Sequence, residues 1–330
     1  MKQSCSWLKI LPIIFGFLLI SCKEDNYSFK LSKDNYAKAH FQFKTNIIDE
    51  SFIGDGEPAI PPKDIFSLIY YSAEDGDMAA YLTPPPKDTS KKYPAVIWLT
   101  GGYGGIGHDD FFWSKQPYDN DQSASPLRRE GLVLMIPSFR GENTNPGRYE
   151  MFFGEMRDIE SARQYLMTLP YVDPKRIYLA GHSTGGTRAL LASEYSEGFR
   201  AVFSLGGVPD LKLRLEYGSI PVAVPFDQSN PAEFEIRSPR TFLNSIKSPT
   251  FYFEGEQSYW EEFDEIKQVA EDKNIPLYIY SIKNGDHFNI ISPLTDLIAE
   301  KILHDTGEKV NIEFNEQDFL NIQHNLPESD

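Results

Sequence analysis

From Tyr93 onward, short and nearly continuous apolar runs alternate with amphipathic segments, which is typical of a parallel sheet covered by helices on both faces. Strands are expected at residues 95–99, 132–136, 177–180, 201–205, 250–253 and 277–282. Helices are expected at residues 154–168, at 261–273 and from Pro293, because apolar residues recur there at helical spacing. The pattern predicts an α/β fold with a mostly parallel, doubly wound sheet.

The segments on either side of this alternation differ from it in composition. Residues 65–71 and 78–82 flank an Asp-Gly-Asp turn, which predicts an N-terminal antiparallel hairpin, so the main domain is assigned to residues 64–305. Residues 22–63 are polar and interrupted by glycine and proline, which favours a tether and an N-terminal arm. Residues 306–330 form an acidic C-terminal tail with no clear period.

The first residues are expected to be an export signal. Lys2 and Lys9 precede an apolar run at residues 10–20, which is too short to span a bilayer as a helix of about 20 residues. The run ends in LISC (19–22), which resembles the lipobox of bacterial lipoproteins and implies that a signal peptide, 1–21, is removed and that Cys22 carries a lipid. We therefore expect a lipid anchor in the bacterial cell envelope, at the outer membrane or cell surface, or secretion if Cys22 is present by chance.

Charge and cysteine content exclude several classes of protein. The formal net charge is −16 and is spread along the chain, so no basic groove is available for nucleic acid. Cys5 lies in the signal and Cys22 at its end, which leaves no cysteine for a disulfide framework or a cysteine-based metal site.

A strand-to-helix turn carries the candidate nucleophile. Residues 176–186 have the sequence RIYLAGHSTGG, in which an apolar strand runs into Gly-x-Ser-x-Gly and a helical segment follows at 187–195. A serine at the tip of such a turn has a strained backbone, and small residues two positions before and after it let strand and helix approach. Gly181 and Gly185 occupy these positions. The context predicts Ser183 as a nucleophile, with a glycine-rich structural turn as the alternative.

The order of motifs resembles an α/β-hydrolase of the prolyl oligopeptidase-like group over residues 93–305. The resemblance is carried by YVDPKR (171–176) before the turn, GGVPD (206–210) after the next strand, and SP (238–239) and IKSP (246–249) before a further strand. It implies a serine hydrolase that attacks an ester or amide carbonyl. The residues before the domain are too few for the β-propeller of the larger oligopeptidases, which favours an esterase over a peptidase.

His287 is the candidate general base. It lies in NGDHF (284–288), after the last expected strand and before the last helix, where this fold places the base. A serine hydroxyl is a poor nucleophile at neutral pH, so a neutral imidazole must take its proton. His108 is the competitor because its loop borders the expected site, although a surface or substrate-contacting role fits it better.

The loop TGGYGG (100–105) follows the first parallel strand, where these hydrolases place part of the oxyanion hole. The resemblance implies that the Tyr103 hydroxyl and the Thr184 amide hold the oxyanion. The alternative is a flexible glycine loop, in which a backbone amide near Gly102 or Tyr103 would serve instead.

The acid of the catalytic triad departs from the family's pattern. The segment FEGEQS (253–258) places Ser258 where the family has its aspartate. Glu256 is the preferred substitute, because its longer side chain offsets its displaced position. Glu254 and Asp210 are alternatives, as is a dyad of serine and histidine alone.

These residues predict a serine hydrolase that cleaves a carboxylic ester, or an amide, through an acyl-enzyme on Ser183 with His287 as general base. A serine peptidase is the first alternative. The second is a non-catalytic, ligand-binding lipoprotein on a hydrolase scaffold, which the missing aspartate motivates. The expected partner is a small-molecule ester or a peptide substrate, neither a metal nor an organic cofactor is implied, and nothing indicates an oligomeric state.

Overall fold

The computed structural model describes residues 31–330 apart from 219–221, 260 and 327–330. The predicted signal peptide and the predicted lipidation site, Cys22, lie outside the described residues. Within the part of the chain that is described, no helix is long and apolar enough to cross a membrane.

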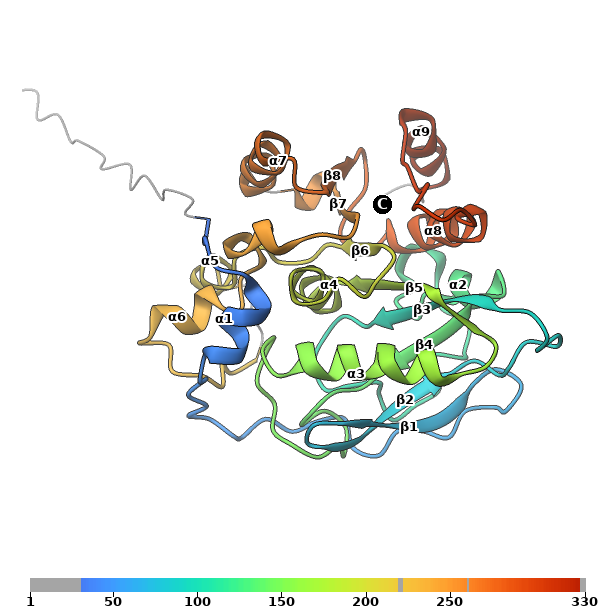
Figure 1. Ribbon diagram of the computed structural model, residues 1–330, viewed down its shortest axis with the longest axis horizontal. Coiled ribbons are helices and arrows are strands. Elements are labelled where there is room, and N and C mark those ends of the chain that lie inside the picture. The colour runs from blue at the N-terminus through green and yellow to red at the C-terminus, as the bar shows by residue number, and fades with distance from the viewer. Residues whose placement is uncertain (1–30, 219–221, 260, 327–330) are drawn as a thin grey trace, which may run out of the picture. The chain divides into compact units, whose positions relative to one another are not determined.

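One sheet forms the centre of the molecule (Figure 1). Its strands are β1 (Ser67–Ala73), β2 (Gly76–Leu82), β3 (Tyr93–Leu99), β4 (Val133–Pro137), β5 (Val172–His182), β6 (Val202–Leu205), β7 (Thr250–Gly255) and β8 (Leu277–Ile282). Among the described residues the order is β1-β2-β4-β3-β5-β6-β7-β8, with β1 and β2 antiparallel to each other, β2 antiparallel to β4, and parallel pairing from β4 to β8. This arrangement is the α/β-hydrolase fold that the sequence predicts.

The strand order reverses its direction between the neighbouring strands β3 and β5. From β3 the chain continues to β4 on one side, whereas from β5 it continues to β6 on the other. The loops that leave the carboxyl ends of β3 and β5 therefore diverge, and such a switch point is where open α/β sheets bind ligands. The glycine loop at 100–105 and the turn at Ser183 are these two loops.

Helices cover both faces of the sheet, and each face has its own apolar core. The helices are α1 (Tyr36–Gln42), α2 (Ser125–Arg129), α3 (Glu155–Thr168), α4 (Thr184–Tyr195), α5 (Leu211–Glu216), α6 (Pro231–Glu235), α7 (Glu261–Lys273), α8 (Ile291–His304) and α9 (Glu316–Asn325). Helices α1, α3 and α4 contribute to one core and α2, α8 and α9 to the other. Strand β3 alternates between them, since Ile97 belongs to the first core and Trp98 to the second.

The two terminal segments are more ordered than the sequence indicates. Tyr36 and His40 of α1 are buried, and Tyr36 donates a backbone hydrogen bond of 2.9 Å to the Ser245 hydroxyl, so this part of the expected arm is docked. In the tail, Phe314 packs with Phe203, and α9 follows with an Asn-Asp capping box. Tertiary packing orders both segments although neither carries a long apolar period.

Candidate active site

Ser183 lies at the tip of the turn between β5 and α4 and is partly exposed. Its backbone has φ 55° and ψ −117°, a conformation that L-residues rarely adopt and that marks a strained, functional turn. A Cβ on Gly181 would overlap the Gly185 backbone, and one on Gly185 would overlap the backbone of Leu99. Both glycines are therefore sterically required for α4 to begin directly against β3 and β5.

His287 faces Glu254 at the carboxyl end of the neighbouring strands. Its Nδ1 atom lies 3.3 Å from Glu254 Oε2. The Glu254 side chain is 6% exposed and the His287 side chain 26% exposed, so the carboxylate is enclosed while the imidazole reaches solvent. The other Glu254 oxygen accepts a 2.8 Å hydrogen bond from the Gly255 amide, which fixes the carboxylate in place.

The other two acid candidates have different partners, which corrects the preference for Glu256. Glu256 Oε2 accepts from the Asn284 amide at 3.1 Å, in an exposed turn. Asp210 caps α5 by accepting from the Leu213 amide at 3.0 Å and forms an ion pair with Arg240. Strand β7 extends to Gly255, beyond its expected end, so the residue that meets the imidazole is the earlier glutamate, Glu254.

Gly206 borders the His287–Glu254 pair, a position that the sequence analysis missed. The Ser183 amide donates to Leu205 O at 2.8 Å, and a Cβ on the next residue, Gly206, would lie 2.5 Å from His287 Cε1 and 3.1 Å from Glu254 Oε2. Only a glycine leaves room there for the pair, and its φ of 63° also favours glycine. The signal was its position directly after an apolar strand, in the GGVPD segment.

The glycine loop that carries Tyr103 contacts the start of α4, next to Ser183. The Thr184 hydroxyl donates to Gly102 O at 2.6 Å, which ties the start of α4 to the glycine loop. Tyr103 packs edge-on against Tyr149, with ring centroids 6.4 Å apart, and burial raises the pKa of the Tyr103 hydroxyl. The raised pKa keeps the phenol protonated at physiological pH.

His182 joins the nucleophile turn to the loop of His287. Its Nε2 atom lies 2.8 Å from the His287 carbonyl oxygen, which can only accept, so Nε2 carries the proton. Burial, followed by the neighbouring His287, lowers the pKa of His182 to about 3. His182 is thus a neutral donor that holds the loop, whereas His108 is exposed on the loop beyond the glycines.

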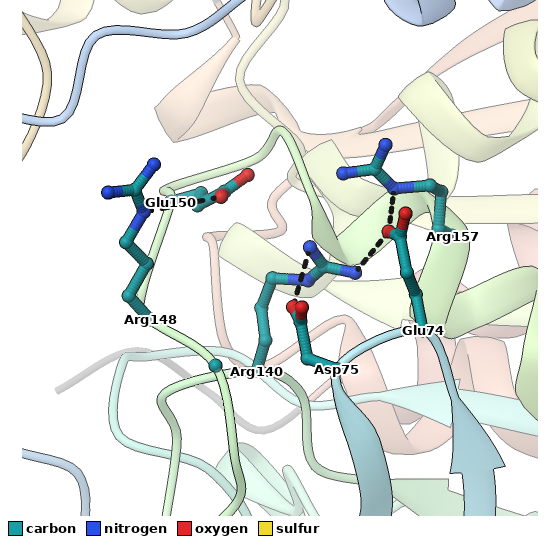
Figure 2. Close-up of a pocket in the computed structure, with 7 residues that line it drawn as sticks. Glu74, Asp75, Arg140, Arg148, Glu150 and Arg157 are labelled. Atoms are coloured by element: carbon teal, nitrogen blue, oxygen red, sulfur yellow. Dashed lines mark hydrogen bonds and ion pairs between the residues drawn. The ribbon is translucent and has the colours of Figure 1, made fainter.

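A second polar feature, a charged pocket of about 370 Å³, lies beside the β1–β2 turn and the start of α3 (Figure 2). Its lining comprises Glu74, Asp75, Arg140, Gly147, Arg148, Glu150 and Arg157. Arg140 pairs with Asp75 at 2.9 Å, and Arg157 lies 2.7 Å from Glu74, so the charges largely neutralise one another. Ser183, His287 and Glu254 do not contribute to this pocket, and we assign it no part in acyl transfer.

The fold and the strained serine turn define an α/β-hydrolase. The model of the prolyl oligopeptidase family matches residues 118–280. An uncharacterized peptidase, YtmA, of Bacillus subtilis is 31% identical over 207 residues, which is 58% of this chain and 73% of the relative. The chain belongs to the prolyl oligopeptidase family.

Solved structures show the same fold. An acylaminoacyl peptidase of Pyrococcus horikoshii superposes with a TM-score of 0.62 at 18% identity, over 77% of this chain and 44% of that one. An esterase of Pyrobaculum calidifontis superposes with a TM-score of 0.51 at 16% identity, over 73% of this chain and 86% of the esterase. The chain therefore spans less than half of the peptidase chain and most of the esterase chain.

Proposed function

We propose that the protein is a serine hydrolase that cleaves a carboxylic ester, or an amide, through an acyl-enzyme on Ser183. The observation that carries the proposal is the convergence at one sheet edge of a strained, partly exposed serine and a carboxylate-paired imidazole. Membership in the prolyl oligopeptidase family supports a hydrolase of this serine type.

In the proposed mechanism, His287 and Glu254 activate the serine. Glu254 Oε2, 3.3 Å from Nδ1, favours the tautomer with the proton on Nδ1 and leaves the Nε2 lone pair free. His287 Nε2 then accepts the Ser183 proton as the serine oxygen bonds to the substrate carbonyl carbon. The carboxylate stabilises the resulting imidazolium.

The Tyr103 hydroxyl and the Thr184 amide donate to the oxyanion of the tetrahedral intermediate. His287 returns the proton to the leaving alcohol or amine as the acyl-enzyme forms. A water molecule, deprotonated in turn by His287, attacks the acyl carbon and releases the acid together with free Ser183.

Peptide cleavage is the second candidate, because the Bacillus subtilis relative bears the name of a peptidase. A substrate panel separates the two functions: p-nitrophenyl acyl esters and acetylated sugars in one arm, aminoacyl and dipeptidyl p-nitroanilides in the other. We expect hydrolysis of the esters that vanishes in Ser183→Ala and persists in Ser229→Ala, which changes an exposed loop serine. Hydrolysis of the anilides alone would assign the peptidase function, and no turnover in either arm would overturn the hydrolase proposal.

We also propose that Cys22 carries a lipid that anchors the enzyme in the bacterial cell envelope. The lipobox-like LISC sequence supports this proposal, and the residues concerned lie outside the described part of the chain. Expressed in its host, the wild type should sediment with membranes and Cys22→Ala should not. A wild type that stays soluble would rule out the anchor.

A further inference from the structure

The glycine loop that carries Tyr103 lies outside the helices and strands of the sheet and depends on neighbours for its shape. Gly102, Gly104 and Gly105 all have positive φ, at 80°, 113° and 120°. Glycines in such conformations lose much entropy on folding, so a loop built from them is not rigid by itself. An oxyanion hole nevertheless needs its donors fixed before the reaction begins.

Asp55, in the N-terminal segment, forms hydrogen bonds with Gly104 and Gly107. These two glycines are the ends of the loop segment that follows Tyr103. The Asp55 amide donates to Gly104 O at 3.0 Å, and its Oδ2 atom accepts from the Gly107 amide at 3.2 Å. A Cβ on Gly104 would overlap the Asp55 carboxylate, which shows how closely this side chain approaches the loop backbone.

Asn143 bonds the same part of the loop. Asp55 and Asn143 together form a clamp on residues 104–107. The Asn143 amide donates a second hydrogen bond, of 2.8 Å, to Gly104 O, and its Oδ1 atom accepts from the Ile106 amide at 2.9 Å. Its Nδ2 group donates to Gly107 O at 3.2 Å and to Gly56 O at 3.0 Å, so the same side chain joins the loop to the N-terminal segment. Asn143 is buried, and its contacts leave the loop little freedom.

An aromatic contact connects the N-terminal segment to Tyr103 itself. Phe52 stacks on Tyr149 with ring centroids 3.9 Å apart and an interplanar angle of 18°. Tyr149 in turn meets Tyr103 edge-on. Residues 52–56 thus support the tyrosine through packing and the glycines through hydrogen bonds.

We propose that residues 52–56 are a working part of the active site and that Asp55 is a positioning residue for the oxyanion donor Tyr103. This inference rests on the proposed hydrolase function. The inference gives the N-terminal segment a role in catalysis. Without these contacts we expect the loop to lose its order, whereas Ser183, His287 and Glu254 keep their positions.

The test compares Asp55→Ala, Asp55→Asn and Asp49→Ala. The Asn variant keeps an oxygen that can accept from Gly107, whereas Asp49 is a matched control on the same segment whose carboxylate bonds Ser51 locally. On the best substrate of the panel we expect Asp55→Ala to lower kcat by about 10- to 100-fold with KM changed less than about threefold. Asp55→Asn should recover most of the rate, and Asp49→Ala should match the wild type.

A double-mutant cycle with Tyr103→Phe distinguishes positioning from general destabilisation. If Asp55 acts through Tyr103, the double variant is no slower than the slower single variant, because the donor that Asp55 positions is already gone. Rate losses that multiply, or an Asp55→Ala enzyme with wild-type kcat, would overturn the inference.

Amide hydrogen exchange over residues 101–107 measures how well the clamp orders the loop, and it does not require catalytic activity. We expect faster exchange there in Asp55→Ala, with the melting temperature close to that of wild type, and unchanged exchange in Asp49→Ala. A wild type without Ser183-dependent turnover would overturn the proposed function alone, and the exchange experiment would still test the clamp. Unchanged exchange in Asp55→Ala would overturn the clamp whatever the activity.

Discussion

Two buried glutamates, Glu254 at the end of β7 and Glu194 at the C-terminal end of helix α4, are in opposite situations. At the carboxyl end of β7, Glu254 faces His287 and also accepts a hydrogen bond from the Gly255 amide. At the C-terminal end of α4, near the docked helix α1, neither oxygen of Glu194 has a hydrogen-bond partner among the described residues. Burial raises the pKa of Glu194 well above its usual range. The first glutamate is suited to orient an imidazole, whereas burial favours the protonated form of the second.

The difference teaches that burial alone does not identify a catalytic carboxylate. Both glutamates are nearly inaccessible: counted over the whole residue, Glu254 is 4% exposed and Glu194 2%. What separates them is the presence of a titratable partner that reaches solvent. Activity should therefore respond to changes at Glu254, and stability to changes around the C-terminal end of α4.

The largest expected effect is on catalysis at Glu254. Glu254→Gln removes the charge that holds the His287 tautomer and stabilises the imidazolium, so kcat should fall by roughly 10²- to 10⁴-fold. Glu256→Gln is the matched control and should stay within about threefold of wild type. Steady-state kinetics on the best ester measures both, and a large loss in the Glu256 variant with a small loss in the Glu254 variant would restore Glu256 as the acid.

Acid sensitivity at the α1 contact should be the next largest effect. His40 stacks on Phe153, and burial lowers its pKa from 6.5 to about 4. As the pH falls, His40 is therefore protonated in the unfolded chain before it is protonated in the folded chain. The stability that His40 contributes is complete above about pH 6.5 and is lost as the pH falls toward 4.

Urea unfolding at pH 7 and pH 5 tests this expectation. His40→Gln should reduce the loss in free energy of unfolding between these pH values by about 2 kcal/mol. An undiminished loss would show that other groups cause the acid sensitivity.

The smallest expected effect concerns Glu194. Its folded-state pKa lies above the unfolded value, so its contribution to stability is complete at low pH and declines as the pH rises above the ordinary carboxyl range. Glu194→Met removes this titration and should raise the free energy of unfolding at pH 8 by about 1 kcal/mol or more. Urea unfolding at pH 6 and pH 8, with kcat as a check, measures it. A less stable variant at pH 8 would mean that the carboxyl stabilises the fold.

Most of the sheet could be predicted from the sequence because its central strands are buried on both faces. The expected strand at 277–282 coincides with β8, and the helix at 261–273 coincides with α7. Strand β5 is longer than expected: it begins at Val172, where the polar DPK residues give no apolar run, because backbone pairing with β3 extends it. Helix α1 could not be predicted, since it has only seven residues and is held by packing rather than by its own period.

The site residues likewise divide into those that a sequence pattern marks and those that it does not. Ser183 and His287 follow apolar strands in motifs with a clear pattern, and their roles remain predictions that the geometry supports. The position of the acid depended on where β7 ends, and strand ends are weakly encoded in sequence. The clamp at Asp55 and Asn143 joins segments far apart in the chain, and no local pattern marks it.

Covalent labelling with a fluorophosphonate probe, followed by peptide mass spectrometry, tests the central claim most directly. The account predicts a single adduct on Ser183 in the wild type, its loss in Ser183→Ala, and labelling that is much slower in His287→Ala. A wild-type protein that hydrolyses no ester and forms no adduct, or one whose adduct lies on another residue, would contradict it.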